Sequence, residues 1–93
     1  MKLGEITVDV VPGSNQLTVV IAGRATVDTS PDLRSVLFGL LRRGATPVVV
    51  IDFSAVSYLD MAGIATLLEA LKAARERSVK LRLTGIRDRK SVV

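Results

Sequence analysis

The sequence predicts a single α/β domain with about four strands in a mainly parallel sheet. Two observations lead to this prediction. Apolar residues make up 48% of the 93 residues, which is enough to form a hydrophobic core. Strand-like and helix-like periodicities also alternate along residues 16–84, and successive strand–helix–strand units build parallel sheets. We therefore expect residues 1–93 to form one domain, near the lower end of the usual size range.

The N-terminal segment predicts an antiparallel edge of this sheet. In residues 5–11, apolar side chains alternate with other residues, as in a half-buried strand. Residues 12–15, Pro-Gly-Ser-Asn, are typical of a turn, and residues 16–23 have the composition of a second strand. We therefore expect a hairpin over residues 5–22.

The first helix is expected over residues 30–43. Thr29 or Ser30 can cap its N-terminus, and Gly44 can end it. Apolar side chains recur within it at helical spacing. They are Leu33, Val36, Leu37, Leu40 and Leu41.

Two more strands and a second helix complete the expected fold. Residues 47–53 are almost continuously apolar, which is typical of a strand covered on both faces. The second helix is expected over residues 61–77, and residues 79–83 alternate as a last strand. Residues 85–93 have the composition of a further helix that stops before it is complete. The expected buried face of the second helix consists of Ile64, Leu67, Leu68 and Leu71.

The residue types present argue against catalysis. Histidine and cysteine are both absent, which removes the usual general base and the thiolate metal ligand. Ser54 and Ser57 therefore have no histidine to activate them. Asp52 and Asp60 are expected to bind loop backbone and to cap the second helix, respectively, rather than to form an acid–base pair. We expect no enzyme activity, no metal site and no cofactor.

The charge distribution predicts a soluble protein with a basic C-terminal end. Residues 1–69 carry a net charge of −2, whereas residues 70–93 carry +6. Residues 70–93 contain no aromatic side chain on which a nucleic-acid base could stack. We therefore do not expect direct nucleic-acid binding. No apolar run approaches the roughly 20 residues of a membrane span. We expect a cytoplasmic protein without membrane insertion.

Residues 23–41 and 48–85 resemble the STAS domain of bacterial anti-sigma factor antagonists. That family typically shows a strand ending in Asp, a short loop, Asp-Ser-Ser-Gly, an amphipathic helix and a last strand. Asp52, Asp60 and Gly63 match this pattern. The likeness covers essentially the whole chain and implies the fold predicted above.

The resemblance also implies a departure in regulation. In the family, a partner anti-sigma factor that is also a kinase phosphorylates the serine before the glycine, and the unmodified form binds this partner and frees a sigma factor. That position is Ala62 here, and the preceding serine is Met61, so the ordinary phosphorylation switch is not expected. An acidic residue often found after the second strand falls on Thr26. Three hydroxyl side chains remain as alternative acceptors: Ser54, Ser57 and Thr66.

We expect a partner to contact the start of the second helix. The expected contact residues are Leu59, Asp60, Met61, Ala62, Gly63 and Ile64. Two interpretations of Met61 stay open, because its side chain either folds inward as core filler or points outward into an apolar patch.

Two functions follow from the resemblance. The first is an anti-sigma factor antagonist that binds a GHKL-type serine kinase acting as anti-sigma factor. The second is an accessory subunit of a lipid-transport ABC complex that braces a cytoplasmic ATPase, since Asp-Thr-Ala-Gly is a similar helix start there. The sequence leaves open whether the protein forms a homodimer and whether the natural chain extends past Val93.

Overall fold

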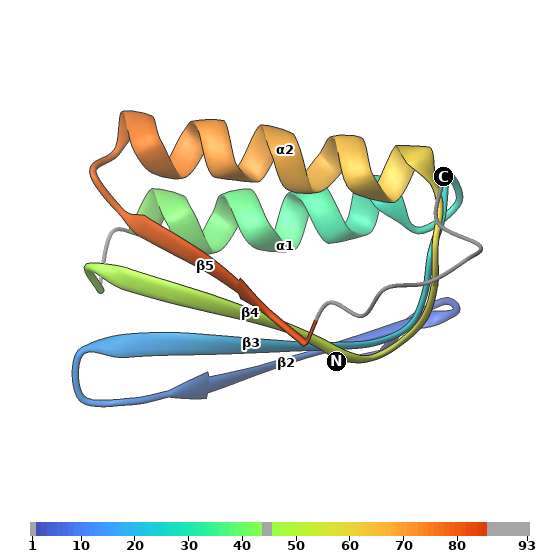
Figure 1. Cartoon of the computed structure of the whole chain (residues 1–93), viewed down its shortest axis with the longest axis horizontal. Helices are drawn as coiled ribbons and strands as arrows, with labels where there is room; N and C mark the ends of the chain where they lie inside the picture. Colours follow the sequence, from blue (N-terminus) through green and yellow to red (C-terminus); the bar gives the residue numbers. More distant parts are fainter. Residues whose placement is uncertain (1, 44–45, 86–93) are drawn as a thin grey trace.

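The computed structural model describes residues 2–43 and 46–85, and its strands form one sheet with both helices on the same face (Figure 1). The strands lie in the sheet in chain order, from β1 to β5. The α/β prediction is confirmed. The elements are β1 (Lys2–Leu3), β2 (Ile6–Pro12), β3 (Gln16–Ala25), α1 (Ser30–Arg43), β4 (Val48–Leu59), α2 (Met61–Glu76) and β5 (Lys80–Thr84).

The predicted hairpin is present as β2 and β3. These strands pair antiparallel from Ile6 opposite Gly23 to Pro12 opposite Leu17. The backbone N–H of Gly13 donates to the carbonyl of Gln16 at 2.8 Å and closes the turn. The two-residue strand β1 adds to the edge by pairing antiparallel with β2. It was not predicted, because two residues are too few to show a period.

The other strand pairs are parallel, as expected of two successive crossover units. The predicted end of the third strand at residue 53 is wrong, since β4 continues to Leu59. This extension pairs with β3 across two register irregularities, with Ala22 opposite Ala55 and Ala25 opposite Leu59. The segment that was expected to be a loop is therefore strand, because β3 supplies its hydrogen-bonding partner.

Helix α1 has the predicted bounds and packs as expected. Leu33, Leu37 and Leu41 are buried against the sheet, one helical turn apart. Thr29 immediately precedes the helix, and its carbonyl accepts the backbone N–H of Leu33 at 3.0 Å. The predicted stop at Gly44 lies outside the described residues.

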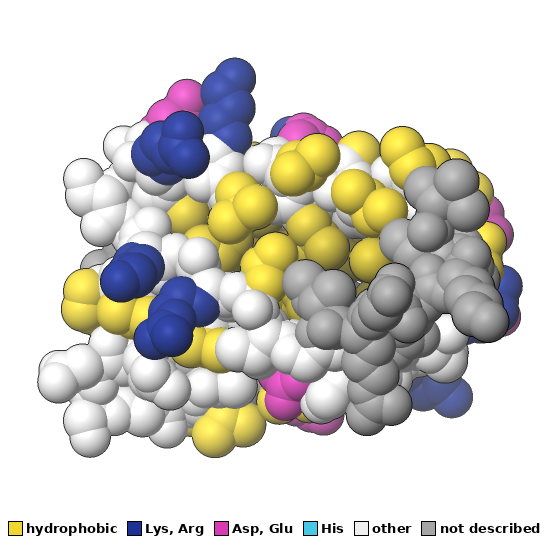
Figure 2. All heavy atoms as spheres, viewed as in Figure 1, with side chains coloured by type: hydrophobic (Ala, Val, Ile, Leu, Met, Phe, Trp, Pro, Cys, Tyr) yellow, Lys and Arg dark blue, Asp and Glu magenta, His cyan; other side chains and the backbone are white. Residues whose placement is uncertain are grey.

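The predicted buried face of α2 is partly wrong. Leu67 is buried, but Leu68 is 60% exposed, and Ile64 and Leu71 are only half-buried. Figure 2 shows apolar side chains along this helix on the face viewed. The face against the sheet consists mainly of small residues, which let the helix backbone approach closely. The buried residues of α2 are Gly63, Thr66, Leu67, Ala70 and Ala74.

The central strand β4 divides its apolar side chains between two faces. Ile51 and Phe53 are buried, whereas Val48 and Val50 are only half-buried. Within residues 2–43 and 46–85, both helices lie on one face, so the expected cover on the second face is not seen (Figure 1). The further helix expected within residues 85–93 falls on 86–93, which lie outside the described residues.

Exchanging each of two glycines for alanine should have opposite effects on stability. Gly23 has a φ of 101°, and a Cβ there would meet the carbonyl oxygen of Glu5. We expect Gly23→Ala to lower the free energy of unfolding by at least about 2 kcal/mol, from backbone strain and overpacking. Gly39 lies inside α1 with nothing near the position of its Cβ. Gly39→Ala should therefore raise stability by about 0.5–1 kcal/mol. Urea unfolding measures both, and equal effects would contradict the packing described for Gly23.

Candidate functional site

The six residues predicted to contact a partner lie where β4 ends and α2 begins. Met61 is the first residue of α2, and its side chain is 65% exposed. It therefore points outward, and the interpretation of Met61 as core filler is wrong. Leu59, Ala62 and Ile64 are half-buried, so only part of each side chain is accessible to a partner. Gly63 is buried, and its lack of a side chain lets the first turn of α2 pack closely against the end of β3.

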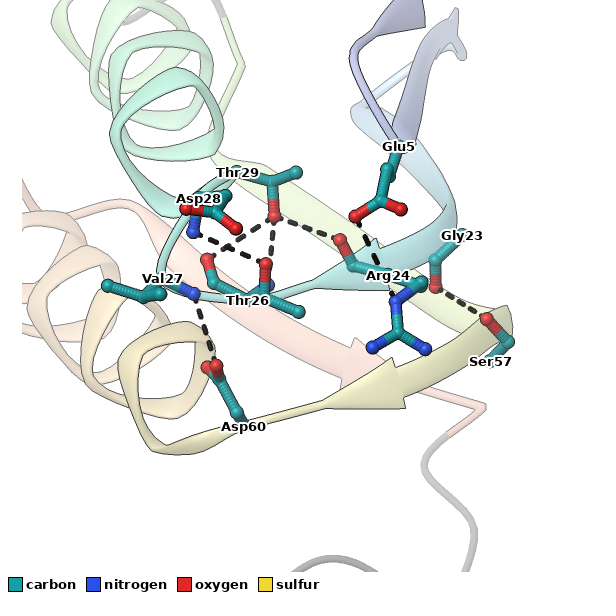
Figure 3. A network of polar contacts seen from close by, with 9 residues as sticks. All are labelled: Glu5, Gly23, Arg24, Thr26, Val27, Asp28, Thr29, Ser57 and Asp60. Carbon is teal, nitrogen blue, oxygen red and sulfur yellow. Dashed lines mark hydrogen bonds and ion pairs between the residues drawn. The ribbon is translucent and has the colours of Figure 1, made fainter.

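Asp60 caps α2 as predicted and also joins it to a second loop. Its Oδ1 accepts the backbone N–H of Gly63 at 3.0 Å, which satisfies a donor in the first turn of the helix. Its Oδ2 accepts the backbone N–H of Val27 at 3.1 Å, from the loop between β3 and α1. The N–H of Asp60 itself donates to the carbonyl of Ala25 at 3.1 Å. This one residue thus ties the start of α2 to the end of β3 (Figure 3).

The polar side chains of the loop between β3 and α1 form hydrogen bonds within that loop. The Thr29 hydroxyl accepts the N–H of Thr26 at 2.8 Å and donates to the carbonyl of Arg24 at 2.9 Å (Figure 3). The Ser30 hydroxyl donates to the carbonyl of Thr26 at 2.7 Å. Thr26, the position where the family often has an acidic residue, is buried and forms part of this network. It offers no charge to a partner.

Val27 is a candidate contact residue that the sequence did not indicate. Its side chain is 66% exposed although it is apolar, and its backbone is tied to Asp60. Because the bond to Asp60 links this loop to the start of α2, we include the exposed Val27 in the candidate surface. The only sequence signal was an apolar residue inside a polar loop segment, and a single such residue is not specific.

The hydroxyl groups considered as alternative phosphate acceptors differ in their surroundings. Thr66 is 4% exposed, and its hydroxyl donates to the carbonyl of Ala62 at 3.0 Å, inside the helix. The Ser54 hydroxyl donates to Oδ1 of Asp52 at 2.7 Å, and the Ser57 hydroxyl donates to the carbonyl of Gly23 at 3.1 Å. Ser54 and Ser57 are exposed, whereas Thr66 is closed to a kinase in the folded protein.

Asp52 and Asp60 serve separate structural roles. The Ser54 hydroxyl, and after it the Ser54 backbone N–H, holds the pKa of Asp52 below its ordinary value, because both bonds favour the ionised carboxylate. Asp52 therefore binds backbone as predicted, although its partner lies within β4. In the described part of the chain, no three His, Cys, Asp or Glu side chains are grouped to hold a metal ion. None of the helices there is long and apolar enough to cross a bilayer.

Replacing Asp60 should weaken both the start of α2 and its link to the loop between β3 and α1. Asp60→Ala removes both carboxylate acceptors. We expect it to lower the free energy of unfolding by about 1–2 kcal/mol, as the loss of a helix cap does in other proteins. Asp60→Asn keeps one carbonyl acceptor and should lose less than half of that. Urea unfolding measures the stability, and amide hydrogen exchange of Val27 reports the link between the loops. If exchange at Val27 is equal in the wild type and Asp60→Ala, Asp60 does not hold that loop.

A family model and a relative of known function are similar to this chain over most of its length. Residues 8–91 match the family model described as the Mlab, STAS domain. The anti-sigma-B factor antagonist of Bacillus subtilis (strain 168) is 32% identical over 84 residues, which cover 90% of this chain and 75% of that protein.

Solved structures show the same fold. The STAS domain of an antisigma-factor antagonist from Rhodobacter sphaeroides superposes with a TM-score of 0.80 at 18% identity, covering 97% of this chain and 98% of that one. An anti-sigma factor antagonist from Mycobacterium paratuberculosis gives a TM-score of 0.72 at 22% identity, covering 89% of this chain and 70% of that one. Because the family model matches residues 8–91 and the Bacillus subtilis relative is 32% identical over 90% of this chain, this chain belongs to the STAS domain family.

Proposed function

We propose that this protein is an anti-sigma factor antagonist that binds a partner anti-sigma factor through residues 59–64 and so releases a sigma factor. The observation that carries the proposal is the outward-facing Met61, 65% exposed beside the small Ala62 at the start of α2. An apolar, uncharged helix start held in place by Asp60 suits a protein contact rather than a reaction. The protein acts by binding and not by catalysis.

The relatives support this proposal. The Bacillus subtilis protein that is 32% identical is named as an antagonist of an anti-sigma factor. The partner of this chain is then an anti-sigma factor of the GHKL serine kinase type, and both act in the cytoplasm. The basic C-terminal end takes no direct part in nucleic-acid binding.

Regulation by phosphate at the helix start is absent in this proposal. Ala62 has no hydroxyl group, so the charge of about −1.5 to −2 that a phosphate brings does not arise there. Thr66 is buried and bonded to the carbonyl of Ala62. A phosphate on Ser54 would stand against the carboxylate of Asp52. Ser57 is the exposed hydroxyl that stays open as an acceptor, so the proposal is that the protein binds without a phosphorylation step at position 62.

A specific observation favours a second function. The description of the family model that matches residues 8–91 includes the name Mlab. In addition, Ala62 matches the alanine of the Asp-Thr-Ala-Gly helix start in STAS subunits of lipid-transport ABC complexes. In this alternative the same surface binds a cytoplasmic ATPase.

Affinity capture from the native cell distinguishes the two functions. The immobilised protein is the bait, and mass spectrometry identifies what it retains. Retention of an anti-sigma factor supports the proposal. Retention of an ABC ATPase supports the alternative and overturns the proposal. The Ala62→Asp variant described next is the matched control bait.

The Ala62→Asp variant should separate folding from binding. Position 62 is the second residue of α2, where a negative charge interacts favourably with the helix dipole by about 0.3–1 kcal/mol. Repulsion from Asp60 offsets part of this gain, so the melting temperature should change little. A carboxylate placed in an apolar contact should weaken partner binding by about 1–3 kcal/mol, or about 5- to 150-fold. Calorimetric titration of the captured protein measures this. If Ala62→Asp melts normally and binds the partner with the affinity of the wild type, residues 59–64 are not the interface.

The Ala62→Ser variant should restore a phosphate acceptor. If the captured partner is a serine kinase, it transfers the γ-phosphoryl group of ATP to the new Oγ, which loses its proton as ADP leaves. Intact mass spectrometry should show one added phosphate on Ala62→Ser and none on the wild type. A stoichiometric phosphate on the wild type would mean that another hydroxyl, such as that of Ser57, carries the switch.

A further inference from the structure

The outer side of β5 is an open edge of the sheet in the described part of the chain. β5 is last in the strand order and pairs with β4 alone, from Val48 opposite Lys80 to Asp52 opposite Thr84. Figure 1 shows it as the strand nearest the viewer, beside α2. We call the outer side of residues 80–84 the β5 edge. An edge of this kind offers backbone groups to a further strand.

The backbone groups at the β5 edge belong to Leu81 and Leu83. The N–H of Lys80 donates to the carbonyl of Pro47 at 2.8 Å, on the side of β4. The backbone groups of successive residues point to opposite sides of a strand, so those of Leu81 and Leu83 point away from β4. The described residues give these outward groups no hydrogen bond. Two N–H donors and two carbonyl acceptors are thus open to an added strand.

The side chains of β5 divide between the two faces of the sheet. Leu81 and Leu83 are half-buried and pack against the core. Lys80 and Arg82 alternate with them and are exposed on the opposite face. Side chains of neighbouring strands lie beside each other on the same face. An added strand therefore places one set of its side chains beside leucine and the other set beside two cations.

An apolar hollow lies beside the β5 edge, between α2 and β5. Its volume is about 260 Å³, and it is lined by Leu71, Arg75, Val79 and Leu81. Figure 2 shows basic side chains over β5 and apolar side chains between β5 and α2. The hollow lies on the face to which Leu81 belongs. Apolar side chains of an added strand on that face gain from burial beside it.

The charge at the β5 edge is positive. Lys80, Arg82 and the Arg75 of the hollow form no ion pair with an acidic side chain in the described part of the chain. The acidic residue of the paired part of β4 is Asp52, which already accepts two hydrogen bonds from Ser54. Carboxylates on an added strand are therefore attracted here. A second copy of β5 is not, because it brings like charges together.

We propose that the β5 edge binds an extended acidic segment of a partner protein as an added strand. Asp or Glu occupies alternate positions beside Lys80 and Arg82, and apolar side chains lie between them. The backbone of Leu81 and Leu83 supplies the hydrogen bonds, and the two cations select the charge of the segment. Residues 59–64 follow the part of β4 that pairs with β5, so this site goes beyond the proposed function and does not depend on it.

Three synthetic peptides of about seven residues, an ordinary strand length, test the proposal on the full chain. The first alternates Glu with Val, the second alternates Lys with Val, and the third has all the Glu residues before the Val residues. Nuclear magnetic resonance of the ¹⁵N-labelled protein measures the binding. The alternating Glu peptide should shift the amides of Leu81 and Leu83 and bind about tenfold more tightly than the others. Equal binding of all three, or shifts confined to other surfaces, would overturn the proposal.

N-methylated peptides test whether the segment binds as a strand. In an antiparallel pair, the residues that exchange backbone bonds with Leu81 and Leu83 are the Val residues of the peptide. Methyl groups on the Val nitrogens should abolish the shifts, whereas methyl groups on the Glu nitrogens, which face solvent, should leave them. The reverse pattern indicates a parallel strand and also supports the site. Equal effects of the two modifications overturn it.

Charge variants test the role of the two cations. Lys80→Gln and Arg82→Gln should each weaken the alternating Glu peptide about two- to fivefold, the range expected for exposed ion pairs. Lys72→Gln is the matched control, because it removes the same charge from an exposed position on the side of α2 that faces α1. Its affinity should be unchanged. An equal loss in all three variants would indicate a nonspecific charge effect and contradict the assignment to the β5 edge.

Hydrogen exchange tests whether the β5 edge is open in the free protein. The amides of Leu81 and Leu83 should exchange fast without peptide and slowly with it, whereas that of Arg82, which faces β4, should be slow in both. Protection of both leucine amides in the free protein would mean that this chain or a second copy already covers the edge, and would overturn the proposal. Ala62→Asp should bind the peptide as the wild type does, so its effect on the captured partner tests the proposed function alone.

Discussion

The carboxylate of Asp60 is the interaction on which the candidate site depends. One oxygen caps α2 through the N–H of Gly63, and the other accepts the N–H of Val27 from a loop 33 residues earlier in the chain. The backbone of Asp60 adds a bond to Ala25 at the end of β3. Two exposed apolar side chains, Val27 and Met61, therefore come to the surface on segments that are fixed relative to each other.

Close packing beneath this point imposes a second constraint. A Cβ on Gly63 would lie 2.7 Å from the carbonyl oxygen of Ala25, so only glycine allows the first turn of α2 to meet β3. Further along the helix, Ala70 and Ala74 continue the same narrow face against the sheet. The larger side chain of Leu68 is then left 60% exposed. Because the backbone of α2 lies close to the strands, only small side chains fit between them, and larger apolar side chains such as Leu68 lie on the surface.

The polar groups around the start of α2 are consistent with the contact surface that we propose. Among the described residues, no buried side-chain nitrogen or oxygen lacks a hydrogen-bond partner. The acidic groups near α1 and α2 either cap, pair or face solvent. Specific recognition must then come from shape, exposed apolar area and the charge around it. These features support the proposed role of this STAS domain in binding another protein.

The sequence by itself determined the order and type of every element except the two-residue β1, because periodicity and turn residues are local properties of the chain. It predicted the bounds of α1, and it predicted α2 to within one residue, together with the capping role of Asp60. Only the tertiary structure decided that β4 continues to Leu59, since that extension depends on pairing with β3. It also decided which face of α2 is buried and brought Val27 beside the start of that helix. These features depend on contacts between segments distant in the chain, and such contacts leave no periodic trace in the sequence.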